Sequence, residues 1–238
     1  MATVNLCIDI GNTRTKAALF EGDRQIAYFP EFDVTELKRL HDEYKPLIKL
    51  SKSGKDYELE CSLKELGEYH LLSHQEALPI TLDYNSPETL GTDRIASAIG
   101  TYHAYPNKNS LIIDLGTCLT IDLIDSKGVF RGGLISPGVQ MRFRAMNEFT
   151  AALPLVEFNN NVTFPGKTTE ESMQVGVYQS IVYEIKGYID SQMEQYGELK
   201  VVDCSGMNLN FDKVLNYKIF AHPKMVLKGL NVLLNHNA

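Results

Sequence analysis

The sequence predicts a mixed α/β protein made of two similar halves that face each other across a cleft. The first observation is a repeated pattern, in which an apolar run ends in Asp, a Gly turn follows, and two further strands complete a meander. This pattern occupies residues 4–29 and recurs at 110–135. The second observation is that helical periodicity follows each meander. Two copies with matching turns indicate an internal duplication, which we expect to divide the chain into halves 1–108 and 109–238.

The elements of the first half follow from apolar runs and turn residues. Three strands are expected, at 4–10, 15–20 and 25–29. Helix-start residues at Asp33 precede a helix over 37–44. Shorter elements are expected at 46–51, 63–67, 69–72 and 81–84. From Arg94 onward apolar residues recur at helical spacing, so the plain interpretation of Asp93 is the N-cap of a helix.

The second half repeats the meander and then adds longer helices. Its strands are expected at 110–114, 119–124, 129–135 and 200–203. Its helices are expected at 139–149, 169–195, 212–215 and 225–234. Gly138 precedes the first of these helices, where glycine allows close backbone approach to a ligand; a simple strand-to-helix turn is the alternative. Thr169 and Ser172 could serve only as helix caps.

Composition and charge exclude several classes of protein. The chain has 238 residues and a net charge of −7, which argues against a general nucleic-acid surface. No two of its four cysteines have C-x-x-C spacing, which favours reduced thiols over disulfides or a zinc site. Neither a basic N-terminal region followed by an apolar core nor an apolar run of membrane-spanning length is present, so we expect a cytoplasmic protein with no membrane partner.

The acid and glycine at the end of each first strand suggest phosphate chemistry. Asp9 is followed by Gly11, Asn12 and Thr13, and Asp114 is followed by Gly116 and Thr117. A carboxylate at this position can hold Mg²⁺, while loop N–H groups and a hydroxyl reach phosphate oxygens. The alternative is an ordinary pair of hairpins with polar turns. The repeat favours two phosphate-binding loops that face one cleft.

Five motifs in a fixed order extend this interpretation over nearly the whole chain. They are D-x-G-N-T-x-x-K at 9–16, G-x-D-R at 91–94, D-x-G-T at 114–117, G-G-x-I-x-P-G at 132–138 and G-K-x-T-x-E/S at 166–172. On these motifs the chain resembles the type III pantothenate kinases, which begin coenzyme A biosynthesis. The two D-x-G loops also resemble those of the superfamily of actin, sugar kinases and heat-shock chaperone ATPases. The resemblance implies their two-lobed, ribonuclease H-like (actin-like ATPase) α/β fold.

The resemblance implies a role for each motif residue in moving the γ-phosphoryl group of ATP to the primary hydroxyl of pantothenate. Asp93 would be the catalytic base, and Asp9 would hold Mg²⁺ at the phosphates. The ATP phosphates would be lined by Asp9, Gly11, Asn12, Thr13, Lys16 and Thr117. Pantothenate would be bound by Tyr84, Gly91, Thr92, Asp93, Arg94 and Thr169. Asp114 would hold a monovalent cation, K⁺ or NH₄⁺, which the family needs.

Simpler roles stay open for some of these residues. Lys16 could be a surface lysine, Arg94 a surface salt-bridge residue, and Tyr84 a strand aromatic. The resemblance further implies a homodimer with sites near the interface, in which Thr169 comes from the neighbouring subunit. One departure is Ser205-Gly206-Met207 where the family carries T-G-G, which bears on how the nucleotide base is held.

Two other functions remain as alternatives. The first is a non-catalytic regulatory protein of the same family, although such a protein would be free to lose Asp9, Asp93 or Asp114 and all three are present. The second is a small-molecule kinase with another acceptor, such as a sugar kinase.

Overall fold

The computed structural model describes residues 4–67, 69–206 and 215–237, which form two compact units. The first unit contains the chain up to Asn107, together with Ile124–Arg131 and the chain from Lys224 onward. The second unit contains Lys108–Leu123 and Gly132–Pro223. The chain first passes from the first unit to the second after Asn107, which is close to the predicted boundary. Two later segments of the chain belong again to the first unit. The division into halves 1–108 and 109–238 stays a prediction.

The first unit is built on a five-stranded sheet in the order β3-β2-β1-β4-β5. Its strands are β1 (Val4–Ile10), β2 (Thr15–Glu21), β3 (Arg24–Phe29), β4 (Leu47–Lys52) and β5 (His70–Leu71). The first three strands form the predicted meander, whereas β4 pairs in parallel with β1. Because parallel strands end at the same edge of a sheet, the carboxyl ends of β1 and β4 lie side by side.

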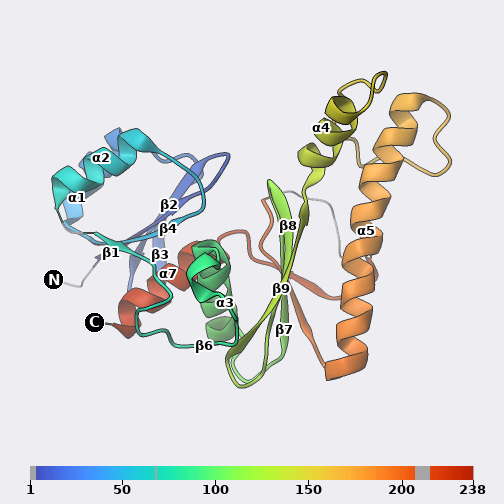
Figure 1. Cartoon of the computed structure of the whole chain (residues 1–238). Helices are drawn as coiled ribbons and strands as arrows, with labels where there is room; N and C mark the ends of the chain where they lie inside the picture. The colour runs from blue at the N-terminus through green and yellow to red at the C-terminus, as the bar shows by residue number, and fades with distance from the viewer. Residues whose placement is uncertain (1–3, 68, 207–214, 238) are drawn as a thin grey trace. The chain divides into compact units, whose positions relative to one another are not determined.

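Helices cover both faces of this sheet (Figure 1). They are α1 (Val34–Tyr44), α2 (Tyr57–Leu66), α3 (Thr92–Ala104) and α7 (Met225–His236). Leu6, Ile8 and Ile10 of β1 are fully buried in one cluster with apolar residues of α1 and α2. The alternate residues of β1 face α3 and α7, as shown by the hydrogen bond from Asn5 Nδ2 to Asn231 Oδ1 at 2.8 Å. Asp9 therefore lies on the face that carries α3.

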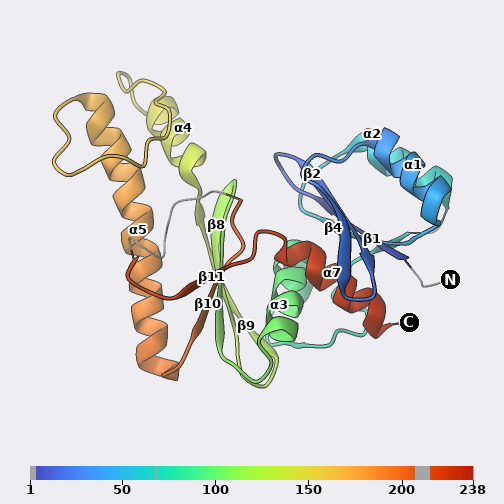
Figure 2. The ribbon, with the colours of Figure 1, turned by 180° about the vertical axis from the view of Figure 1, so that it is seen from behind.

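The second unit contains a sheet with the same order of strands (Figure 2). The strands of this sheet are β7 (Ser110–Leu115), β8 (Cys118–Ile124), β9 (Val129–Pro137), β10 (Lys200–Asp203) and β11 (Ile219–Ala221), of which the end of β8 and the beginning of β9 fall in the segment Ile124–Arg131 of the first unit. They follow the order β9-β8-β7-β10-β11, which is the order of β3-β2-β1-β4-β5 in the first unit. As in the first unit, β10 is parallel to the central strand. The shared strand order confirms the predicted duplication of the meander.

Two helices, α4 (Val139–Phe149) and α5 (Thr169–Tyr196), cover one face of the second sheet. Leu111, Ile113 and Leu115 of β7 are buried in one cluster with their apolar residues. Asp114 has the opposite parity, so it lies on the other face, as Asp9 does in the first unit. The strand β6 (Thr81–Leu82) pairs with the beginning of β9 and lies within the short element expected at 81–84.

Most predicted elements are confirmed, but some helix starts and caps differ. The N-cap of α3 is Gly91, so the interpretation of Asp93 as the cap is wrong: Asp93 lies within the first turn. The helix expected at 63–67 begins earlier, because the Asp56 side chain accepts a hydrogen bond from the Leu59 N–H and caps α2. The cap of α5 is Thr168, and neither Thr169 nor Ser172 has that role. The helix expected at 212–215 falls at 212–214 outside the described residues. In the described chain, the helices are too short or too polar to cross a bilayer.

Candidate active site

Two carboxylates of the first unit lie close enough for their charges to interact. Asp9 stands next to the end of β1, and Asp93 stands in the first turn of α3. Burial, and next the charge of Asp93, raise the pKa of Asp9 to about 6, although Lys16 and a hydrogen bond from Ser51 act in the opposite direction. Asp9 Oδ1 is buried and has no hydrogen-bond partner among the described residues. An unsatisfied carboxylate oxygen beside a second acid is suited to a bound cation.

Strand register places Lys16 and Ser51 on either side of Asp9. Asp9 is opposite Lys16 on β2 and opposite Ser51 on β4. Lys16 is half-buried and its charge lowers the pKa of Asp9, so it is not the isolated surface lysine of the alternative interpretation. The Ser51 hydroxyl is buried and lies 3.1 Å from Thr92 Oγ1. Ser51 was missed in the sequence because its strand was assigned without a partner, and only parallel pairing with β1 brings it to the site.

The loop after Asp9 is held by backbone contacts. The Gly11 N–H donates to the Arg14 carbonyl at 3.2 Å, and the N–H groups of Ser53 and Gly54 both donate to the Ile10 carbonyl. A Cβ atom on Gly54 would lie 2.0 Å from the Gly11 carbonyl oxygen. Asn12 and Thr13 at the tip are exposed. The loop is thus closely supported by the chain that follows β4, while its tip is accessible to a ligand.

The loop after Asp114 has the same kind of support. The Gly116 N–H donates to the Cys118 carbonyl at 2.9 Å, and the Gly138 N–H donates to the Thr117 carbonyl at 3.1 Å. A Cβ atom on Gly138 would lie 2.4 Å from the carbonyl oxygens of Gly116 and Thr117. The close approach predicted at Gly138 is therefore to the D-x-G-T loop itself.

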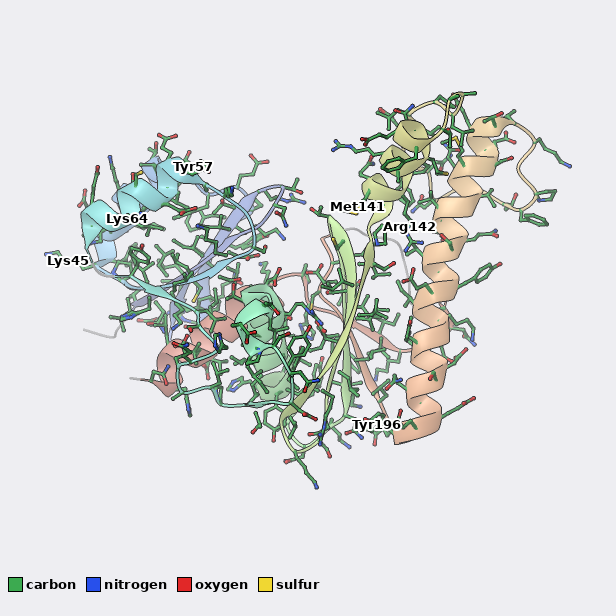
Figure 3. The ribbon with its side chains drawn as sticks, viewed as in Figure 1. Lys45, Tyr57, Lys64, Met141, Arg142 and Tyr196 are labelled. Carbon is green, nitrogen blue, oxygen red and sulfur yellow. The ribbon has the colours of Figure 1, made fainter. Side chains whose placement is uncertain are left out.

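A half-buried arginine fixes the segment before Gly138. Arg142 of α4 donates to the Pro137 carbonyl at 2.8 Å and to hydroxyls of Ser136 and Ser180, and it pairs with Glu184 of α5. Figure 3 labels Arg142 at the base of α4, next to α5. The planar guanidinium joins β9, α4 and α5 through one side chain. This contact set holds the glycine against the D-x-G-T loop, and no sequence motif had indicated it.

Asp114 and two further acids, Asp122 and Asp203, lie near Cys204 in the second unit. Burial, followed by the charges of Asp114, Asp203 and Asp122, raises the pKa of the Cys204 thiol well above its usual value. The Cys204 N–H donates to the Ile113 carbonyl at 2.7 Å, so this chain is tied to β7. Within the described ranges, no group of three or more His, Cys, Asp or Glu side chains is arranged to hold a metal ion. Any cation here needs ligands from the backbone, water or substrate as well.

Aromatic rings hold the arginine of the G-x-D-R motif. Arg94 is only 6% exposed, so the alternative of a surface salt bridge is wrong. Its guanidinium carbon lies 6.0 Å from the centre of the Tyr84 ring and 5.9 Å from that of Phe130. The two rings are 6.1 Å apart, which is typical of aromatic pairs. Tyr84 and Arg94 are thus brought together as predicted, and Phe130 joins them from the strand β9.

Thr169 lies apart from these groups along the chain, at the first residue of α5. It is exposed and lines a hollow of about 590 Å³ in the second unit. The hollow is also lined by Met146, Leu153, Gly166, Lys167, Thr168, Ser172, Met173 and Gly176.

Of the turn Ser205-Gly206-Met207, the last residue lies outside the described residues. Ser205 instead supports the second acid loop, because its Oγ accepts the Leu115 N–H at 2.9 Å.

The raised pKa of Asp9 predicts a stability gain when its charge is removed. The pKa rises from its usual 3.8 to about 6 on folding, so ionising Asp9 costs stability progressively between about pH 4 and pH 6, and the full cost applies above that. We expect ligand-free Asp9→Asn to be more stable than the wild type by about 1 to 3 kcal/mol at pH 7.5. The gain should vanish at pH 4. Urea unfolding at both pH values measures it, and an equal difference at the two would contradict the assignment.

Comparison with known proteins agrees with the motifs and the fold. A family model described as type III pantothenate kinase matches residues 5–191. Proteins named "Type III pantothenate kinase" from Bacteroides fragilis strain YCH46 and from Cytophaga hutchinsonii are each 38% identical to this chain. The alignment covers 98% of this chain in both cases, with 98% of the first protein and 100% of the second.

Solved structures share the fold at lower identity. A putative Baf family transcriptional activator from Campylobacter jejuni has a TM-score of 0.60 and 22% identity, over 98% of this chain and 100% of that one. A putative 2-dehydro-3-deoxygalactonokinase from Sinorhizobium meliloti has a TM-score of 0.60 and 11% identity, over 98% of this chain and 99% of that one. These matches and the two duplicated sheets confirm the predicted actin-like α/β fold. Together with the family model and the full-length relatives, they show that the chain belongs to the type III pantothenate kinase family.

Proposed function

We propose that this protein phosphorylates the primary hydroxyl of pantothenate with ATP, giving 4'-phosphopantothenate in the first step of coenzyme A biosynthesis. The observation that carries the proposal, beyond family membership, is the proximity of Asp9 and Asp93. Their charges interact across the ends of β1 and α3, and Asp93 is not used as a helix cap. A phosphoryl-transfer site needs one acid for the metal and phosphates and another for the attacking hydroxyl.

Phosphoryl transfer depends mainly on positioning and charge neutralisation. Mg²⁺ fits Asp9, since this metal binds through one or two carboxylates together with phosphate oxygens and water. When bound, it would neutralise charge on the phosphates. Asp9 Oδ1, which lacks a partner among the described residues, would hold it, and Lys16 would add a second positive charge. The N–H groups and hydroxyl of Gly11, Asn12 and Thr13 would contact phosphate oxygens, and so would Thr117.

Asp93 would orient the pantothenate hydroxyl and accept its proton as the bond to phosphorus forms. Its Oδ1 accepts the Arg94 N–H at 2.8 Å, which fixes the carboxylate in the first turn of α3. Tyr84 and Arg94 would bind the acceptor, with the buried guanidinium complementing the pantothenate carboxylate. The Thr92 hydroxyl is bonded within the protein, so Gly91 and Thr92 would contribute through their backbone.

A homodimer is part of the proposal. Large apolar side chains are exposed along α4, α5 and the segment between them, including Phe149 at 80%, Phe164 at 76% and Tyr183 at 65%. Exposed apolar residues gathered in one region indicate an interaction surface. Thr169 at the start of α5 would reach the pantothenate site of the neighbouring subunit.

The deciding experiment is a coupled assay of ADP release with and without pantothenate. We expect ADP release that requires pantothenate and is not supported by glucose or N-acetylmannosamine. ADP release with a sugar alone would favour the alternative kinase. If no acceptor supports it, the regulatory, non-catalytic alternative would be preferred, and the proposed function would be wrong.

We also expect the reaction to require K⁺ or NH₄⁺. Asp114 is the proposed site, and the negative charges of Asp122 and Asp203 near Cys204 favour a cation in that region. Replacing K⁺ with Na⁺ at constant ionic strength should lower kcat/KM by at least about tenfold, which corresponds to about 1.4 kcal/mol of transition-state stabilisation. Steady-state rates in KCl, NH₄Cl and NaCl measure this. Equal rates in the three salts would refute the role of Asp114.

A further inference from the structure

We propose that the hydroxyls of Thr92 and Ser51 form a relay that positions Asp9 for its metal. Both would be positioning residues for the reaction, and neither would touch the substrate through its hydroxyl. The inference rests on the proposed function, because it assumes that Asp9 holds Mg²⁺ at the ATP phosphates. It concerns only residues of the first unit, which lie on β1, β4 and α3.

The relay follows from three contacts. The Lys52 N–H donates to Thr92 Oγ1 at 2.9 Å. Thr92 Oγ1 lies 3.1 Å from Ser51 Oγ, and either hydroxyl could donate. Ser51 is opposite Asp9 in the parallel register of β1 and β4, and its hydroxyl, as a hydrogen-bond donor, lowers the pKa of the Asp9 carboxyl. Ser51 is fully buried and Thr92 is half-buried, so water does not compete freely for these hydroxyls.

Counting donors and acceptors gives the direction of the relay. An ionised carboxylate only accepts, so the Ser51 hydroxyl donates its single proton to Asp9 and leaves its oxygen free to accept. The Thr92 hydroxyl has two acceptors within reach, Ser51 Oγ at 3.1 Å and the Lys52 carbonyl at 3.4 Å, and the relay uses the shorter contact. The Thr92 oxygen accepts from the Lys52 N–H, so in this arrangement each donor is directed toward Asp9. Such a chain is polarised and strengthens the final bond to the charged group.

The relay also sets the spacing between the two acids. Thr92 begins α3 and directly precedes Asp93, whereas Ser51 is opposite Asp9 in the parallel register. A bond between the two hydroxyls therefore ties the helix that carries the base to the strand edge that carries the metal ligand. Removing a residue that hydrogen-bonds to a metal ligand typically lowers metal affinity or activity about 10- to 100-fold.

The test compares Thr92→Val, which keeps the shape and removes the hydroxyl, with Thr92→Ser, which restores it. Ser51→Ala and the double variant complete the set. The readouts are the Mg²⁺ concentration for half-maximal rate, the KM for pantothenate, and MgADP binding by calorimetry without pantothenate. Ser97→Ala is the matched control, because this buried serine on α3 donates only to the Arg94 carbonyl, at 3.0 Å.

We expect Thr92→Val and Ser51→Ala each to raise the Mg²⁺ midpoint and the MgADP dissociation constant by about tenfold or more. In the double variant, these two values should rise no further than in the more strongly affected single variant, because both substitutions break the same chain of hydrogen bonds. Thr92→Ser should restore the Mg²⁺ midpoint, whereas Ser97→Ala should keep both the wild-type Mg²⁺ midpoint and the wild-type KM for pantothenate.

Wild-type Mg²⁺ and MgADP values in Thr92→Val would overturn the relay, as would equal losses in Ser97→Ala. If Ser51→Ala fails to fold, Thr92→Val and Thr92→Ser decide alone. The proposed function fails in a different way, since wild-type protein would then release no ADP with pantothenate. In that case the MgADP titrations still test the relay, and a wild type that does not bind MgADP would overturn it.

Discussion

Replacing Asp93 with Asn should lower kcat by about 100- to 10,000-fold, the usual contribution of a general base. The change keeps the shape of the side chain and its contact with the Arg94 N–H, because an amide oxygen can accept that bond as well. MgATP binding should be retained or become tighter. The reason is that the Asp93 charge raises the pKa of Asp9, so removing it makes Asp9 easier to ionise.

Rapid-quench kinetics and MgATP titration together measure these two effects. Asp42→Asn is a suitable control, because it also removes one negative charge, from an exposed position on α1. This helix covers the sheet face opposite to Asp9, so the control should keep kcat within about twofold. A turnover of Asp93→Asn close to that of Asp42→Asn would rule out Asp93 as the base. Lost MgATP binding with unchanged chemistry would instead indicate a role in nucleotide binding.

The fold was largely predictable because apolar periodicity and turn residues fix local structure. The two meanders and the long helices α4 and α5 occur where the sequence predicted them. The placement of α7 was not predictable, since an amphipathic helix shows which face is buried but not which sheet covers it. Asn231 and Asn5, whose side chains join α7 to β1, are polar residues within apolar runs, and nothing in the sequence indicates that they pair with each other.

The site was predictable only where residues lie in a motif. Asp9, Lys16 and Asp93 lie near one another as expected, since strand ends and a helix start bring them together. Asp93 also shows how a local rule can mislead. Asp is a favoured cap, but the helix begins one residue after Gly91 and leaves the carboxylate in its first turn. Ser51 depends on strand pairing across about forty residues of sequence, which no local pattern encodes.

Gly54→Ala should abolish most of the activity although Gly54 lies in no motif. The added Cβ would lie 2.0 Å from the Gly11 carbonyl oxygen and 2.9 Å from the Asn12 nitrogen, and both are backbone atoms. A side chain could rotate away, but this backbone is tied by the bonds of Ser53 and Gly54 to the Ile10 carbonyl. The phosphate loop must therefore shift, and a displacement of about 1 Å in a positioning element costs about 100-fold. We expect kcat/KM for ATP to fall by about that factor.

Steady-state kinetics with varied ATP measure this loss, and a thermal melt reports any loss of folding. Gly187→Ala provides the control, since its Cβ would meet nothing within 4 Å on α5. Alanine in a helix is favoured over glycine by about 1 kcal/mol, so this variant should be as stable as the wild type or more so. Unchanged ATP kinetics in Gly54→Ala would show that the first loop does not hold the phosphates.

Gly138→Ala extends this experiment to the second loop and separates the roles of the two halves. Its Cβ would lie 2.4 Å from the carbonyl oxygens of Gly116 and Thr117, so the D-x-G-T loop would be displaced as the first loop is in Gly54→Ala. If Asp9 holds Mg²⁺ and Asp114 holds the monovalent cation, the two variants should differ in which ion they require at higher concentration. Gly54→Ala should raise the Mg²⁺ midpoint, whereas Gly138→Ala should raise the K⁺ midpoint. The same duplicated architecture would then support two different cations, because each glycine acts on the carboxylate of its own strand end.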